Sequence, residues 1–104
     1  MNSQLLRKVV RRQLVTFRAK HFHENAIDPG KQWIYSEIEQ RLIHFRESSV
    51  DHYHPTFSQL VKAFLEQHQH LNKSQLKKAF KRYHKEHAVL RVVSIEFNNK
   101  LNYL

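Results

Sequence analysis

This chain of 104 residues contains one glycine and two prolines. Antiparallel β-sandwiches and barrels need many tight turns, and those turns draw heavily on glycine and proline. The shortage of both residues therefore favours helices joined by few turns. Apolar residues make up 40% of the chain and include seven Phe. This is enough to build a modest core in a single domain spanning residues 1–104.

Apolar periodicity predicts two helices in the first half of the chain. Residues 3–21 place apolar side chains on one half of a helical wheel and basic side chains on the other half. Residues 31–47 carry Ile34, Ile38 and Leu42 at helical spacing. The Asp-Pro-Gly sequence at residues 28–30 supplies the turn between the two helices.

Two further helices are predicted in the second half, separated by a short connection. The third begins after residue 55 and ends near residues 68–71. The fourth follows Asn72, which matches a helix N-cap because Gln75 stands three residues later, as in a capping box. Its apolar stripe of Leu76, Phe80 and Tyr83 lies opposite a broad band of Lys and Arg.

Residues 89–104 are compatible with two structures. Val93, Ile95 and Phe97 alternate with polar residues and precede Asn98-Asn99, which indicates a small β-hairpin. Apolar residues in the same segment also fit a helical stripe, so a helix is the alternative.

The expected fold class is mainly α: a small four-helix domain, winged-helix-like if the C-terminal β-hairpin forms. Residues 1–22 would be a basic amphipathic helix, and residues 56–104 a helix-turn-helix followed by the hairpin. The expected core contains Leu14, Phe17, Ile38, Leu42, Phe45, Leu60, Phe64, Leu76, Phe80 and Leu90, with Trp33 and Phe57 as secondary members.

The positive charge is concentrated in two segments. Residues 1–20 hold six Lys and Arg and no acid, and residues 73–85 hold six more and no acid. Residues 21–72 have a net charge of −3 and residues 86–104 a net charge of zero, so these two segments carry all of the formal net charge of +9. Polyanions are the usual partners of such segments, because binding releases condensed counterions.

These features predict a non-enzymatic nucleic-acid-binding protein, a small regulator or accessory factor, with DNA preferred over RNA. The expected phosphate contacts come from the fourth helix and the first helix: Lys73, Lys77, Lys78, Lys81, Arg82 and Lys85, with Arg7, Arg11 and Arg12. A band rich in Lys positions a protein on phosphates without reading sequence, and only Arg82 and Gln75 are suited to reading bases.

The alternative is a protein-interaction module. The first helix could form a homodimer if Leu6 or Val9 were exposed, or the basic faces could bind an acidic partner, as an inhibitor or immunity-type factor would. Residues 1–20 also have the composition of a mitochondrial presequence or of a helix lying on an anionic membrane. We expect instead that this helix packs on the domain, in a cytoplasmic protein.

Several kinds of chemistry find no support in the sequence. The chain has no cysteine, and its single glycine cannot form a glycine-rich phosphate loop. No GxSxG nucleophile motif and no apolar stretch long enough to cross a membrane is present. Nine histidines occur, several in close pairs such as His84 and His87, but without the spacing of an established metal motif. No cofactor, metal or catalytic residue is predicted.

Overall fold

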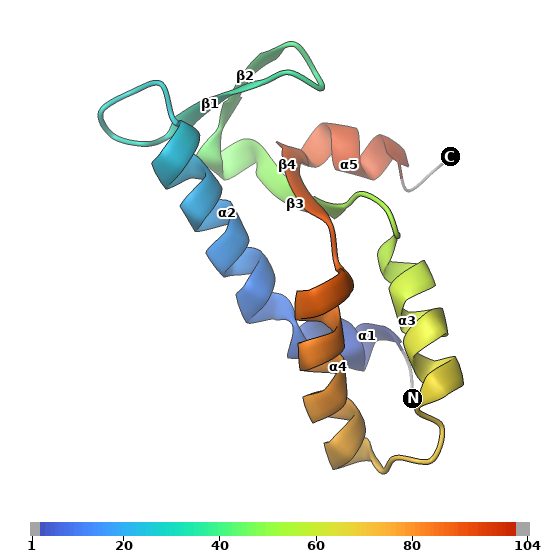
Figure 1. Ribbon diagram of the computed structural model, residues 1–104. Helices are drawn as coiled ribbons and strands as arrows, with labels where there is room; N and C mark the ends of the chain where they lie inside the picture. Colours follow the sequence, from blue (N-terminus) through green and yellow to red (C-terminus); the bar gives the residue numbers. More distant parts are fainter. Residues whose placement is uncertain (1–2, 102–104) are drawn as a thin grey trace. The chain divides into compact units, whose positions relative to one another are not determined.

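The computed structural model describes residues 3–101. In chain order these residues form α1 (Ser3–Val9), α2 (Arg11–Asn25), β1 (Trp33–Ser36), β2 (Arg41–His44), a 3-10 turn η1 (Phe45–Glu47), β3 (Ser48–His52), α3 (Phe57–Gln67), α4 (Lys73–His87), β4 (Leu90–Ser94) and α5 (Ile95–Leu101), as drawn in Figure 1.

The chain divides into two compact units, and the division falls within α2 and near the outer ends of β3 and β4. The helical unit comprises the described parts of residues 1–14 and 52–89, and it contains α1, α3 and α4. The strand unit comprises the described parts of residues 15–51 and 90–104, and it contains both small sheets and α5.

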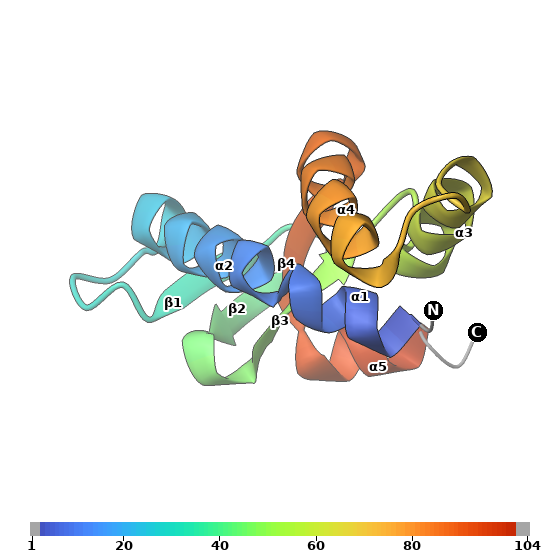
Figure 2. The ribbon, with the colours of Figure 1, turned by 90° about the horizontal axis from the view of Figure 1, so that it is seen from below.

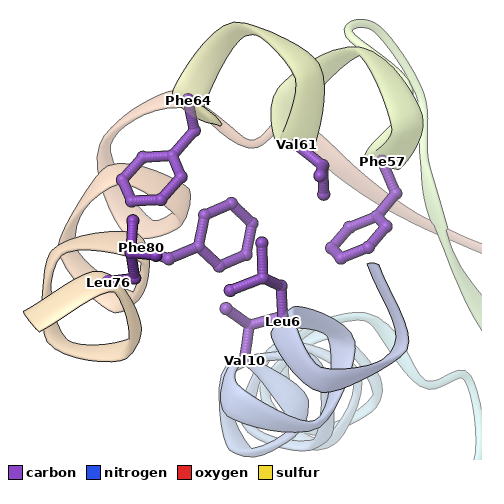
Figure 3. Close-up of a cluster of buried hydrophobic side chains, with 7 residues drawn as sticks. All are labelled: Leu6, Val10, Phe57, Val61, Phe64, Leu76 and Phe80. Atoms are coloured by element: carbon purple, nitrogen blue, oxygen red, sulfur yellow. The ribbon is translucent and has the colours of Figure 1, made fainter. Parts of the chain in front are cut away.

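The helical unit is held together by apolar side chains from three helices. Leu6 and Val10 are fully buried, and so are Phe64 and Phe80. Figure 3 shows these side chains converging from the α1 end of the chain, α3 and α4, with the aromatic rings at the centre. Figure 2 shows α1 lying across the α3–α4 pair, in agreement with its packing against both helices. The amphipathic stripes of three separate segments therefore form one core.

The strand unit is built around the β1–β2 hairpin, which lies at the C-terminal end of α2 in Figure 1. The strands pair antiparallel, and Ile34 stands directly opposite Ile43. Both isoleucines are buried against Phe22 of α2 and Val92 of β4. A second two-stranded sheet pairs β3 with β4.

The expectation of a mainly α four-helix domain is wrong. The described residues form five α-helices and two small sheets, which is a mixed α and β structure. Residues 31–47 form the hairpin and η1 instead of a helix. Ile38 and Leu42, which were expected in the core, are 47% and 44% exposed. The helical spacing of these residues was misleading because the strands carry apolar residues on both faces.

The expectation of a C-terminal hairpin is also wrong, and the winged-helix arrangement with it. Residues 90–94 form β4, which pairs with β3 far away in sequence, and residues 95–101 form α5. The last part of the expected hairpin, residues 102–104, lies outside the described residues. Glu39, in the β1–β2 connection, accepts hydrogen bonds from the backbone N and the Oγ of Ser94 at 2.8 and 2.6 Å. This contact fixes the point where β4 ends and α5 begins.

The predicted helix over residues 3–21 is divided at Val10 into α1 and α2. The core prediction holds best for the third and fourth helices, where Phe57, Leu60, Phe64, Leu76 and Phe80 are buried. Trp33, by contrast, is 40% exposed. The remaining expected core members are partly buried: Leu14, Phe17, Phe45 and Leu90. None of the helices within residues 3–101 has the length and apolar character to cross a membrane.

Candidate nucleic-acid interface

Helix α4 is the element that positions most of the candidate contacts. The Asn72 side chain accepts a hydrogen bond from the Gln75 backbone N at 2.9 Å, and the Gln75 side chain accepts one from the Asn72 backbone N at 3.0 Å. This capping box confirms the predicted start of the fourth helix. The helix buries Leu76, Phe80 and His84, so its opposite side is left to solvent.

The predicted cations of α4 lie on this solvent side. Lys73, Lys78, Lys81, Arg82 and Lys85 are exposed. Lys77 differs, because it stands beside the buried stripe and is itself half-buried. Within residues 3–101, Arg82 is the one cation of α4 that lies in an ion pair, with Nε 3.3 Å from the Glu86 carboxylate. The lysines of this helix therefore present charge that no carboxylate of the described chain neutralises.

A second group of cations lies at the junction of α1 and α2. Arg7, Arg11 and Arg12 are exposed, as predicted for this segment, and none of them is in an ion pair within the described residues. The Arg7 guanidinium lies 4.3 Å from the centre of the Phe57 ring, which anchors its position. Lys8 was not predicted as a contact, but it lines the same groove as Arg7 and Arg11.

This groove has a volume of about 390 Å³ and runs along α1 and the start of α2. Three cations line it together with Gln4 and Leu14, and no acidic side chain does. Lys8 could have been found from the sequence, because it follows Arg7 directly and lies on the same polar half of the helical wheel.

The two groups of cations belong to the same unit, and a glutamine joins the elements that carry them. Gln13 of α2 donates a hydrogen bond from Nε2 to the Lys81 carbonyl oxygen at 3.0 Å. Its Oε1 lies 2.8 Å from Nδ1 of His84. The α1–α2 junction is therefore held against the C-terminal half of α4, although the two segments are about seventy residues apart in sequence.

His84 continues this network into the core of the helical unit. It is 1% exposed, and its Nε2 lies 2.8 Å from Nε2 of His52. Burial lowers the pKa of His84, because the apolar surroundings disfavour the imidazolium ion. The close pair His84 and His87 does not form a joint site, because His84 is buried and His87 is exposed beside Tyr83. No set of three potential metal ligands comes together among the residues that the structure describes.

The two units differ in net charge. The helical unit has eleven Lys and Arg and two acids, Glu66 and Glu86, and so carries a formal charge of +9. The strand unit has seven Lys and Arg and seven acids, and so carries none. The entire excess of positive charge therefore lies on one compact unit.

One expectation about this region is wrong. Leu6, one of the residues expected on a dimer surface of the first helix, is fully buried, and Val9 is packed against the core.

Comparison of the chain with protein-family models, curated proteins and solved structures gave no match.

Proposed function

We propose that the helical unit is a non-enzymatic nucleic-acid-binding module that holds the phosphates of duplex DNA. The observation that carries this proposal is the concentration of charge: eleven cations against two acids in one compact unit. Uncompensated cations on a folded surface attract polyanions over long range and are neutralised when phosphates displace counterions.

The contact surface consists of α4 and the groove along α1. The exposed Lys78, Lys81 and Lys85 follow one another at intervals of three and four residues, which places neighbours about 4.5 and 6 Å apart along the helix axis. A DNA duplex carries one negative charge for about every 1.7 Å of its axis, so several phosphates lie within reach of such a row. Arg7, Lys8 and Arg11 add a second site for phosphate in the groove.

Binding by this surface would be independent of base sequence. Gln75 already holds the start of α4, because its side-chain oxygen accepts from the Asn72 backbone N. Arg82 is paired with Glu86. Both side chains suited to reading bases are thus engaged within the protein, and the lysines that remain act as point charges on the backbone of the nucleic acid.

Fluorescence anisotropy with a labelled duplex and a labelled single-stranded RNA, each at two salt concentrations, tests the proposal. If about five phosphates are contacted, the logarithm of the binding constant falls with the logarithm of salt concentration at a slope of about −4.5. The variant Lys78→Glu/Lys81→Glu should bind at least tenfold more weakly and show a slope shallower by about 2.

A charge-matched control separates the surface from net charge. Lys31→Glu/Arg46→Glu makes the same change in total charge at exposed positions of the strand unit. This variant should bind within about threefold of the wild type if the contact is made by α4 and the groove along α1, because it leaves the cations of that surface unchanged. Equal losses in both variants, or no binding by folded protein at low salt, would contradict the proposal.

A further inference from the structure

A second groove of the helical unit lies between the end of α3 and one side of α4, and we call it the α3–α4 groove. Its volume is about 630 Å³. Sites that bind small organic molecules usually measure about 300–1,000 Å³. His68 and Leu71 line the groove from the end of α3 and the connection that follows it. Ala79 and Tyr83 line it from α4, so the groove combines two rings with two apolar side chains.

The rings at the end of α3 are arranged for stacking. His68 stacks on Phe64, with ring centres 4.3 Å apart and planes that differ by 19°. The exposed His70 is also nearly parallel to His68, with ring centres 6.5 Å apart and planes that differ by 20°. His68 is half-buried, so the contact with Phe64 holds the ring while part of it stays accessible. Parallel aromatic planes of this kind fit a ligand that contains a flat ring.

Polar atoms of both rings in the groove are left to a ligand. Nδ1 of His68 donates a hydrogen bond to the Phe64 carbonyl oxygen at 2.8 Å, because a carbonyl oxygen can only accept. Nε2 of the neutral His68 ring is then an acceptor, and it has no partner within residues 3–101. The Tyr83 hydroxyl likewise makes no hydrogen bond to the described residues. Both groups can therefore bond the polar edge of a ligand.

Cations of α4 line the same groove. Arg82 is paired with Glu86, which also lines the groove, so this pairing neutralises the acid. Lys78 is exposed and forms no ion pair within residues 3–101. It also belongs to the surface that is proposed above to hold phosphates. A ligand that matches the groove therefore has a flat ring joined to a phosphate, and this is the chemistry of a nucleotide.

We propose that the α3–α4 groove binds an unpaired nucleobase, stacked on His68 and His70, of a nucleotide whose phosphate is held by Lys78. This inference rests on the proposed function, because it requires α4 to be a surface for phosphates. It extends that function to DNA with a single-stranded segment, since a base inside a duplex is stacked and paired and must leave the stack to be reached. Every base has a flat face, so binding in the groove would depend little on the identity of the base.

A duplex with a short single-stranded tail tests the inference. It is compared with the blunt duplex and with the same duplex carrying a tail of abasic nucleotides, which has the same number of phosphates but no bases. Fluorescence anisotropy should show that the tail with bases binds about tenfold more tightly than the abasic tail. The salt dependence of the two should be equal, because equal numbers of phosphates are neutralised.

Substitutions at His70 separate stacking from charge. His70→Ala removes one ring and should lose most of the preference for the tail with bases, while it binds the blunt duplex as the wild type does. His70→Phe keeps a flat ring without the imidazole nitrogens and should retain the preference. His23→Ala makes the same change as His70→Ala at an exposed position of the strand unit and should also retain it. His68→Leu is a second test, because it removes the other ring but keeps an apolar side chain beside Phe64. Far-UV circular dichroism checks that each variant is folded.

Four results would overturn the inference. Equal binding of the two tails would do so and, where the blunt duplex is still bound, would leave the proposed function intact. A preference for bases that persists in both folded His70→Ala and folded His68→Leu would place the bases elsewhere. Absence of salt-dependent binding to all three DNAs would contradict both proposals. A poly-glutamate peptide that binds as tightly as the tail with bases, and is weakened equally by His70→Ala, would assign the groove to an acidic peptide.

Discussion

Acidification should destabilise the helical unit through His84, and the hydrogen bonds around this residue determine the sign. Gln13 Nε2 donates to the Lys81 carbonyl oxygen, so its Oε1 faces His84 Nδ1, which must donate. The Nε2 atom of neutral His84 is then an acceptor, and His52 Nε2 donates to it across 2.8 Å. A second proton on His84 would set two N–H groups against each other unless His52 moved its own proton from Nε2 to Nδ1. The neutral form of His84 is therefore the one that the folded state holds.

The magnitude follows from linkage. Burial lowers the pKa of folded His84, whereas in the unfolded chain the histidine takes up its proton near its ordinary value of 6.5. Below that pH the unfolded state binds more protons, so the free energy of unfolding falls as the pH falls. The loss begins as the pH passes about 6.5, and its slope for one histidine is at most about 1.4 kcal/mol per pH unit. Two aromatic rings that pack on His84, those of Phe57 and Phe80, are uncharged.

Urea unfolding followed by far-UV circular dichroism at about pH 7.5, 6.5 and 5.5 measures this effect. His84→Gln cannot titrate, so it should be less stable by about 1–3 kcal/mol at the highest pH but should lose much of the pH dependence. His87→Gln makes the same change at an exposed site on the same helix, and this variant should keep the pH dependence of the wild type. The lowered pKa of His21, caused by burial and opposed by Glu24, contributes equally in all three proteins. An unchanged pH dependence in His84→Gln would refute the reasoning.

Two further predictions concern single contacts that position the elements. Glu39→Ala should lower the free energy of unfolding, measured by urea titration, by about 3 kcal/mol, because the buried backbone N and Oγ of Ser94 lose a charged acceptor. The control Glu37→Ala, at an exposed position, should change the free energy of unfolding by less than about 0.5 kcal/mol. Asn72→Ala should cost about 1 kcal/mol by removing the cap of α4, measured in the same way; a loss as large in the exposed Asn99→Ala would show that the cap is not responsible.

The sequence predicts the α3–α4 region well because local signals agree there. Asn72 and Gln75 form the expected capping box, and the stripe containing Leu76 and Phe80 faces the core. The helical period, the cap and the charged face all indicate the same structure. The cations of α4 could therefore be assigned to an exposed surface without any long-range information.

The prediction of a helix over residues 31–47 is wrong for an equally specific reason. Periodicity identifies a strand when one face is polar, but Trp33, Ile34 and Tyr35 put apolar side chains on both faces of β1. The alternation of apolar and polar residues that identifies a strand was therefore absent. Ile34, Ile38 and Leu42, spaced by four residues, matched a helix by chance. A run of Trp, Ile and Tyr is itself typical of strands, and at residues 33–35 it indicates the structure that forms.

Other features depend on contacts that no local pattern encodes. The boundary between β4 and α5 depends on Glu39, which is 55 residues away in sequence. The pairing of His52 with His84 and the bridge from Gln13 to Lys81 are equally remote. The bridge from Gln13 to Lys81 also holds the two basic segments together in one unit, which the sequence left open.

The placement of the two basic segments in the fold follows from the way in which their apolar stripes pack. Leu6 and Val10 meet Leu76 and Phe80 in one core, so the basic halves of both helices must face outward from the same unit. Mutual repulsion among eleven cations with two acids opposes this folding. A polyanion bound to the folded unit removes that repulsion and stabilises it by mass action. The positive charge that opposes folding of the helical unit by itself would thus also favour its binding to DNA.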